Sequence, residues 1–408
     1  MKKTQNTTST GWTQAVVLCE SYRVRSDKAD TLLSRYCKGI SSEERRRCQF
    51  LFFGAIRHRR LIETVLAPLM KRAPRKRVGA ILEIALAEML GAPRDDWPKV
   101  VDFAVGRVKH EFSKQDAGFV NAVLRRAIER LAELLATSET EEVGAAAVVH
   151  SHPDWLAKRW EQAHGAASTL SLMRWNQEPA QVTVRWRGKE GVPLPDFLKE
   201  TQWESFYTVE GAPWSAVEPL LSSGHIFAQD PATRIPVMLL QVEPGEQVLD
   251  LCAAPGGKSL MMADMLGDDP KGRLVAVEKP GNRVAQLDEN LAKLDNGEGC
   301  TVELVEADLF NVPVEPVFQA VLLDAPCSNT GVLRRRPDAK WRLQEEDIEK
   351  SAALQLRMLQ HASGFVAKGG RIVYSTCSIE ADENQQVVER FLSDNEGFKL
   401  ELKKLSFP

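Results

Sequence analysis

Two short strings, 50 positions apart, hold the residues of this sequence best suited to nucleophilic chemistry. One is Asp-Ala-Pro-Cys-Ser at 324–328 and the other is Tyr-Ser-Thr-Cys-Ser at 374–378. Each string begins where an apolar, strand-like run ends, and the strand ends of an open α/β sheet converge on one ligand crevice. The sequence therefore predicts that Cys327 and Cys377 share a pocket. Two thiols placed in this way are suited to attacking a carbon electrophile and later releasing it.

A third string, Asp-Leu-Cys-Ala-Ala-Pro-Gly-Gly-Lys at 250–258, also follows a strand-like run. Its glycines allow close approach of the backbone to a ligand, and the helix start that follows offers unpaired N–H groups. The spacing matches neither GxGxxG nor GxxxxGK[ST], which disfavours a dinucleotide or a nucleoside triphosphate. We assign the following residues to a cofactor-binding turn: Cys252, Ala253, Ala254, Pro255, Gly256, Gly257 and Lys258.

Acidic residues come at the ends of the next three strand-like runs. Glu278 is placed to bind ribose hydroxyls, as the acid at this position does in dinucleotide sites. Asp308 is expected near an adenine ring, and Asp324 ends the fourth run. Each acid taken singly also fits a helix cap, but the series fits a nucleoside cofactor without phosphates, which favours S-adenosylmethionine. Arg283, in the helix after Glu278, is expected to position the cofactor or that acid.

The elements that must position these residues alternate regularly along the chain. Apolar runs predict strands at 247–251, 273–277, 301–305, 320–324 and 370–374, and helices at 258–265, 280–294, 345–366 and 381–392. This alternation is typical of a parallel sheet with helices on both faces. Upstream, residues 182–229 mix short strands, such as 182–186, with helices, such as 195–200.

The N-terminal part has apolar residues at helical spacing throughout, which predicts an all-helical domain at 11–137. Polar, acidic and small residues then predict a linker at 138–150. A connecting α+β region at 151–228 and an α/β domain at 229–408 complete the predicted organisation, with a helix opening after His152-Pro153.

Charge is unevenly divided in this chain of 408 residues with net charge −3. Residues 1–137 hold 26 Lys and Arg against 15 Asp and Glu, a net +11, which leaves −14 for the remainder. A basic module on an acidic body indicates that one end binds a polyanion, although a solvated basic face gives the same composition.

The remaining bulk properties indicate a cytoplasmic protein, and nothing in them demands more than a monomer. No apolar run approaches the length of a membrane span, and the N-terminus lacks a secretory signal. Seven scattered cysteines without a CxxC pair argue for reduced thiols and against a metal site.

Together the strings resemble those of the NOL1/NOP2/Sun family of RNA cytosine-C5 methyltransferases. The resemblance extends to Gln229-Asp230, to Gly-Val-Leu-Arg-Arg at 331–335, and to Glu383-Asn384. Residues 11–136 are similar to the RNA-binding NusB antitermination factor, most clearly in Phe-Val-Asn-Ala-Val-Leu-Arg at 119–125. This combination is typical of the bacterial branch that acts on small-subunit ribosomal RNA.

The resemblance implies a NusB-like RNA-binding domain, a small connecting domain and a Rossmann-like class I methyltransferase that uses S-adenosylmethionine. The implied substrate is a cytosine of 16S ribosomal RNA. Within the family, the Thr-Cys-Ser cysteine, here Cys377, is the nucleophile, and the Pro-Cys cysteine, here Cys327, serves product release. Asp324, in its acid form, would hydrogen-bond ring nitrogen N3. From the residues alone, either cysteine could attack.

Two other functions stay open at this point: methylation of transfer RNA or another RNA, and a non-catalytic RNA-binding or ribosome-assembly role. A nicotinamide-dependent oxidoreductase is disfavoured by the absent GxGxxG. The sequence also departs from the family. Glu278 stands where Asp is usual, and a further strand around Asp-Gly-Phe-Phe is absent, so the sheet is expected to lack an edge strand.

Overall fold

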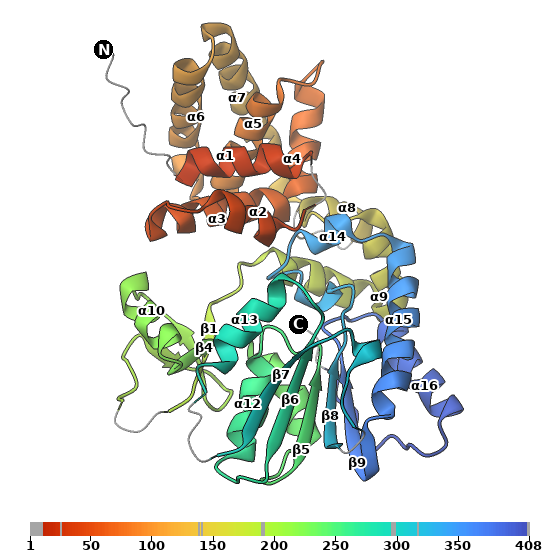
Figure 1. Cartoon of the computed structure of the whole chain (residues 1–408). Helices are drawn as coiled ribbons and strands as arrows, with labels where there is room; N and C mark the ends of the chain where they lie inside the picture. Colours follow the sequence, from red (N-terminus) through yellow and green to blue (C-terminus); the bar gives the residue numbers. More distant parts are fainter. Residues whose placement is uncertain are drawn as a thin grey trace. The chain divides into compact units, whose positions relative to one another are not determined.

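The computed structural model describes residues 11–24, 27–137, 139, 142–188, 192–294, 299–315 and 318–405. The chain forms two compact units, which we describe separately (Figure 1). Unit 1 comprises Met1–Pro179 together with Val332–Leu343, and unit 2 comprises Ala180–Gly331 and Gln344–Pro408. Within the described ranges, no helix combines the length and the apolar character that a membrane crossing requires.

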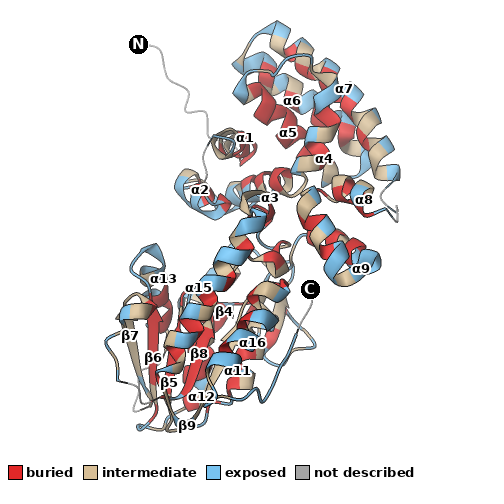
Figure 2. Cartoon of the chain, turned by 90° about the vertical axis from the view of Figure 1, so that its right-hand side faces the viewer, coloured by how far each residue is buried: buried red, intermediate tan, exposed pale blue. Residues whose placement is uncertain are grey.

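Unit 1 is helical, as the apolar spacing of residues 11–137 predicts. Its central helix α5 is largely apolar, and eleven of its residues, Glu83 among them, are buried, which is why the other helices pack around it (Figure 2). The helices are α1 (Gly11–Tyr22), α2 (Ala29–Tyr36), α3 (Ser42–Arg57), α4 (Arg59–Leu66), α5 (Lys76–Leu90), α6 (Trp97–Glu111), α7 (Lys114–Ala136), α8 (Val143–Val149), α9 (Asp154–Gln177) and α14 (Ala339–Arg342).

The predicted linker at 138–150 contains a packed helix. Helix α8 buries Val143, Ala146, Ala147 and Val149, and it packs against α9. The run Gly-Ala-Ala-Ala-Val-Val combines small residues with good helix formers, so the segment is helical where the sequence indicates a linker. The helix predicted after His152-Pro153 is confirmed as α9.

The segment 332–343 belongs to unit 1 although it follows the Pro-Cys string directly in sequence. Trp341 donates from Nε1 to the carbonyl of Ile56 at 2.7 Å, and Arg57 donates to the carbonyl of Arg334 at 3.0 Å. The carboxylate of Asp338 accepts a hydrogen bond from the backbone of α2 at 3.3 Å. These bonds fix the segment to the ends of α2 and α3.

Unit 2 is built on the predicted parallel sheet, in the order β7-β6-β5-β8-β9. All five predicted strands are confirmed as β5 (Gln247–Leu251), β6 (Arg273–Glu278), β7 (Thr301–Glu306), β8 (Phe318–Asp324) and β9 (Val366–Ser375). Strand β5 lies between β6 and β8, and Leu251 pairs with Leu323 at the carboxyl ends. The order changes direction at β5, which is where α/β sheets bind ligands.

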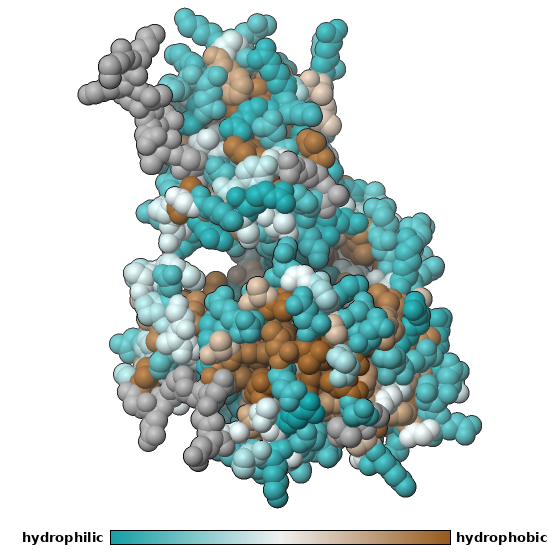
Figure 3. Space-filling model, viewed as in Figure 1, coloured by the Kyte–Doolittle hydropathy of each residue, from teal (hydrophilic) through white to brown (hydrophobic). Residues whose placement is uncertain are grey.

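Helices cover both faces of this sheet. On one face, Val321 and Leu323 pack with α15 and α16; on the other, Ala320 and Leu322 pack with α11 and α12, because successive strand residues point to opposite sides. The helices of unit 2 are α10 (Trp214–Ser222), α11 (Arg234–Leu240), α12 (Gly257–Leu266), α13 (Asn282–Leu291), α15 (Glu345–Ser363) and α16 (Gln385–Asp394). In Figure 3, apolar side chains gather over unit 2 within a largely hydrophilic surface.

A second, antiparallel sheet precedes the parallel one, in the order β2-β3-β1-β4. It consists of β1 (Thr183–Trp186), β2 (Leu198–Glu200), β3 (Phe206–Val209) and β4 (Ile226–Ala228). The helix predicted at 195–200 is wrong, because Leu198 pairs with Val209 and Glu200 with Tyr207 in this sheet. Pairing with a strand about ten residues away decides the conformation of so short a segment.

Candidate active site

The predicted cofactor turn leaves β5 and enters α12. Gly256 has φ +102°, in the region where glycine is favoured, and a Cβ there would lie 3.0 Å from Leu287. Gly257 opens α12, and a Cβ at this position would approach Phe227 to 3.1 Å. The two glycines therefore allow the turn to lie close to its neighbours and leave the start of α12 open to a ligand.

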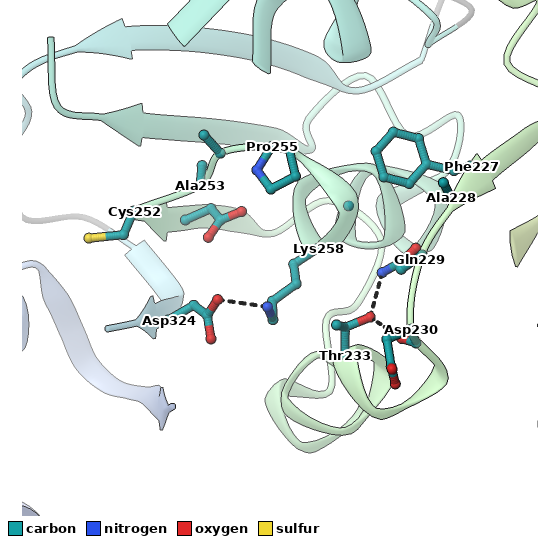
Figure 4. Close-up of a pocket in the computed structure, with 13 residues that line it drawn as sticks. Phe227, Ala228, Gln229, Asp230, Thr233, Cys252, Ala253, Pro255, Lys258 and Asp324 are labelled. Atoms are coloured by element: carbon teal, nitrogen blue, oxygen red, sulfur yellow. Dashed lines mark hydrogen bonds and ion pairs between the residues drawn. The ribbon is translucent and has the colours of Figure 1, made fainter. Parts of the chain in front are cut away.

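The turn forms one wall of a pocket within unit 2 (Figure 4). The pocket holds about 530 Å³ of space, its open mouth included. Of the residues assigned from the sequence, Asp324 and all of the turn except Gly256 line it. The other lining residues are Phe227, Ala228, Gln229, Asp230, Thr233 and Asp250.

These further lining residues were not assigned to the site from the sequence. Two signals were available: Gln229-Asp230 as part of the family resemblance, and Asp250 as the first residue of the string at 250–258. Asp250 lies on β5, whereas the other five come from the short strand β4 and the turn after it. Gln229 donates to Met261 of α12 at 3.2 Å. Contacts between segments about 30 residues apart are not visible in the local pattern.

Asp250, at the end of β5, is 1% exposed and lines the pocket. Its Oδ2 accepts a hydrogen bond from Ser259 at 2.5 Å, while Oδ1 has no partner among the described residues. Burial raises the pKa of this carboxyl from 3.8 to about 7, although Ser259 and Lys258 act in the opposite direction. A buried acceptor in a pocket wall suits a ligand that carries a positively charged amino group.

Glu278 and Arg283 hold the cofactor turn from behind. Glu278 is 6% exposed and accepts a hydrogen bond from the backbone N–H of Ala254 at 2.9 Å. Arg283 donates to the carbonyl of Ala254 and lies 3.5 Å from Glu278. The pair thus binds both backbone groups of Ala254, and neither side chain lines the pocket.

Asp308 caps the short 3₁₀ helix Leu309–Asn311, accepting from the N–H of Phe310 at 3.1 Å. This hydrogen bond, together with Lys279 at 3.1 Å, lowers the pKa of Asp308. Asp308 is also outside the pocket lining. The predicted contacts of Glu278 with ribose and of Asp308 with adenine stay predictions.

Asp324 links three elements at the carboxyl edge of the sheet. Its Oδ2 lies 2.7 Å from Nζ of Lys258, and its Oδ1 accepts from Ser375 at the end of β9, also at 2.7 Å. Burial opposes the charge on Lys258, but Asp324, Asp250 and Cys377 outweigh it and raise the pKa of the lysine. Lys258 is therefore a charged hydrogen-bond donor between the pocket and the cysteines.

The two cysteines predicted to share a pocket lie side by side, with 3.1 Å between their Sγ atoms. Cys327 is half-buried and Cys377 is exposed, 3.4 Å from Oδ1 of Asn329. The hydrogen bond to Cys377, and secondarily burial, raise the pKa of the Cys327 thiol. The Cys327 thiol thus keeps its proton, and this raised pKa together with the lower exposure of Cys327 distinguishes two thiols that the sequence leaves equivalent.

The half-buried Cys252 has its pKa raised to about 12 and is a poor nucleophile.

Arg334, which belongs to the string at 331–335, is engaged within unit 1. Its guanidinium lies 3.9 Å from the centre of the Trp175 ring and donates to the carbonyls of Glu178 and Pro179.

In the parts of the chain that the structure describes, no cluster of three or more His, Cys, Asp or Glu side chains could hold a metal ion.

Comparison with known proteins relates both units to established families. A family profile described as "16S rRNA methyltransferase RsmB/F" matches residues 237–407, and one described as "NusB family" matches residues 14–129. Ribosomal RNA small subunit methyltransferase B of Klebsiella pneumoniae is 30% identical, over 87% of this chain and 83% of its own. The protein of that name from Serratia proteamaculans is also 30% identical, over 91% and 87%.

The fold has a counterpart among solved structures. The crystal structure of PH0851 superposes with a TM-score of 0.71, over 94% of this chain and 89% of its own, at 21% sequence identity. The chain thus shares its whole architecture, helical unit included, with a protein of distant sequence.

Proposed function

Because the chain belongs to the RsmB/F family of 16S rRNA methyltransferases, we propose that it methylates carbon 5 of a cytosine in small-subunit ribosomal RNA. The methyl donor is S-adenosylmethionine, and the reaction passes through a covalent bond between Cys377 and carbon 6 of the base. The single observation that carries this proposal is the pair of sulfurs 3.1 Å apart, of which one keeps its proton.

The residues that line the pocket fit the polar groups of S-adenosylmethionine. The unpartnered Oδ1 of Asp250 can accept from the amino group of the methionine part, and the open start of α12 offers N–H donors. Glu278 and Arg283 shape the turn, and Glu278 retains lone pairs for ribose hydroxyls. When bound, the cofactor supplies an electrophilic methyl group.

Carbon 5 of cytosine is a weak nucleophile, so the chain's own residues must activate the base. The Cys377 thiolate adds to carbon 6, and the electron pair of the 5,6 double bond moves toward carbon 5 and the ring. Asp324, in its acid form, donates a hydrogen bond to N3 of the base, and the ammonium of Lys258 beside it can supply the carboxylate with that proton. Carbon 5 then carries the electron density needed to take up a methyl group.

Product release requires that a base from the solvent takes the carbon 5 proton. The electron pair left at carbon 5 re-forms the 5,6 double bond as the bond between Cys377 and carbon 6 breaks, and the sulfur leaves as a thiolate. The thiol of Cys327, held by its raised pKa in the protonated form, donates a hydrogen bond to the departing sulfur. This stabilises the leaving thiolate, so we assign Cys327 to release.

RNA binding is assigned to residues 11–137, with 151–228 as a connecting region and 229–408 as the methyltransferase domain. The match to the NusB family and the net charge of +9 of residues 11–137 (24 Lys and Arg against 15 Asp and Glu) support the first assignment. A cytosine of 16S ribosomal RNA is the preferred target because both relatives described above carry the name of a small-subunit enzyme.

The test uses small-subunit RNA with 5-fluorocytosine, because fluorine at carbon 5 blocks elimination and traps the covalent complex. With S-adenosylmethionine, the wild type and Cys327→Ala should give a protein–RNA band that survives denaturation, and Cys377→Ala should give none. With ordinary RNA, Cys327→Ala should accumulate the band. A wild type that binds RNA and cofactor without forming an adduct would instead support an RNA-binding role.

A further inference from the structure

A buried carboxylate, that of Glu383, holds the loop that carries Cys327. Glu383 is 0% exposed and accepts hydrogen bonds from the backbone N–H of Ser328 at 2.9 Å, from the Ser328 hydroxyl, and from Gln355 Nε2 at 3.0 Å. The same amide of Gln355 donates to the carbonyl of Pro326 at 2.9 Å. Both neighbours of Cys327 in sequence are therefore fixed by Glu383, directly or through Gln355.

The next residue, Asn384, holds the loop that carries Cys377. Its Oδ1 accepts from the Thr376 hydroxyl at 2.6 Å, and its Nδ2 donates to the carbonyls of Ser378 at 2.8 Å and Glu380 at 3.0 Å. Thr376 and Ser378 are the neighbours of Cys377. Two consecutive side chains thus bind the flanking residues of two cysteines that lie 50 positions apart.

Direct contacts join the two loops as well. The Ser378 hydroxyl lies 3.1 Å from the hydroxyls of both Ser328 and Thr330. The N–H of Gly331 donates to the carbonyl of Cys377 at 3.0 Å, and a Cβ on Gly331 would lie only 2.8 Å from that oxygen. The loops are therefore in close contact, and a shift of one moves its cysteine relative to the other.

Stability alone is a poor reason for a carboxylate at this place. Burial of a charge is unfavourable without a partner of opposite charge. Among the described residues, no lysine, arginine or histidine forms an ion pair with Glu383, which relies on neutral donors. Charge-assisted hydrogen bonds are shorter and more directional than neutral ones, and they suit a group whose task is to fix a loop.

We propose that Glu383 and Asn384 are positioning residues that together set the separation of the two sulfurs, Glu383 for Cys327 and Asn384 for Cys377. This inference rests on the proposed function and deepens it, because it divides the two residues between two steps. Glu383 serves release of the product, which depends on Cys327. Asn384 serves formation of the covalent bond, which depends on Cys377.

The geometric part of the proposal is tested without RNA. Diamide takes two electrons and two protons from a pair of thiols, which become a disulfide while diamide becomes a hydrazine. Peptide mass spectrometry then gives the rate at which Cys327 and Cys377 are joined. In Glu383→Gln, the amide N–H of the new side chain faces the N–H and O–H groups whose hydrogen bonds Glu383 accepts. In Asn384→Asp, the side chain can no longer donate to the carbonyls of Ser378 and Glu380. Each should slow disulfide formation about 10- to 100-fold, since misplacement by about 1 Å has effects of that size.

Two controls separate positioning from loss of fold. Gln386→Ala changes an exposed residue at the start of α16, the helix that follows Asn384, and should behave as wild type. Amide hydrogen exchange of β8, whose residues Ala320–Leu323 are fully buried, reports unfolding of unit 2, to which both residues belong. Unchanged disulfide rates in Glu383→Gln and Asn384→Asp would overturn the proposal. So would slowing that comes with faster exchange of β8.

The catalytic part uses the RNA adducts. Glu383→Gln should form the 5-fluorocytosine adduct at nearly the wild-type rate but accumulate the covalent complex on ordinary RNA. Asn384→Asp should form the adduct slowly and accumulate none. Equal effects of both variants on both steps would refute the division of roles. If the wild type forms no adduct, the proposed function fails, and the diamide rates still decide whether the two residues position the thiols.

Discussion

At the scale of single residues, the acids at the strand ends have different tasks although the sequence presents them as a series. Asp250 lines the pocket with a free oxygen, whereas Glu278 binds the backbone of Ala254 and Asp308 caps a turn. Burial does not separate Asp250 from Glu278, which are 1% and 6% exposed. The chemistry of each acid thus depends on which of its carboxylate oxygens already accepts a hydrogen bond within the protein.

Asp250 gives a prediction about pH. Its pKa is raised from 3.8 to about 7, so its contribution to stability is full below pH 3.8 and is lost as the pH rises toward 7. Asp250→Asn keeps the neutral state at every pH. In urea unfolding without cofactor, the variant should gain about 3 kcal/mol relative to wild type between pH 5 and pH 8. Asp268→Asn, at an exposed position, is the matched control. A pH-independent difference for Asp250→Asn would show that the carboxyl is ionised throughout.

At the scale of elements, the junction of β5 and α12 is where a local conformation decides whether a ligand can approach. The strand and the helix are predictable from their apolar pattern. The turn between them depends on Gly256 at φ +102° and on two side chains, Glu278 and Arg283, that bind its backbone from the next strand and helix. The turn therefore keeps its conformation through contacts of its backbone with side chains from β6 and α13.

Gly256→Ala should weaken cofactor binding. A side chain at this φ costs about 1–3 kcal/mol, and the new Cβ would press on Leu287 at 3.0 Å. We expect the dissociation constant of S-adenosylmethionine, measured by calorimetry, to rise at least about tenfold. Gly397→Ala is the matched control, because a Cβ there meets nothing within 4 Å. Equal affinities of the two variants would mean that the turn adapts to a side chain.

At the scale of the whole molecule, the chain leaves unit 2 four residues after Cys327, contributes residues 332–343 to unit 1, and then returns. The segment is fixed by Trp341, whose ring also lies under Arg59 with 5.4 Å between guanidinium and ring centre. The basic helical unit and the cysteine loop are thus connected through this short segment as well as through the main connection near residue 180.

Two substitutions of Trp341 should differ in their cost. Trp341→Phe removes the hydrogen bond to Ile56 and should cost about 1 kcal/mol of unfolding free energy. Trp341→Ala also removes the ring from its packing against the helical core, and about 3 kcal/mol is expected. Amide hydrogen exchange of α3 would report the loss in unit 1. Trp214→Ala, at a residue 43% exposed in unit 2, is the control and should leave α3 unchanged.

The sequence by itself determined the helical and the α/β parts, the five strands of the parallel sheet, the cofactor turn and both cysteines. These features depend on residues close together in the chain, where periodicity and turn chemistry act. Only the tertiary structure decided what depends on distant partners. It made β2 a strand and α8 a packed helix, and it assigned 332–343 to unit 1. It also buried Asp250 and set the sulfurs of Cys327 and Cys377 3.1 Å apart, so that one thiol keeps its proton. The burial and the electrostatic environment of a side chain depend on all its neighbours in space, whereas the sequence gives only its neighbours along the chain.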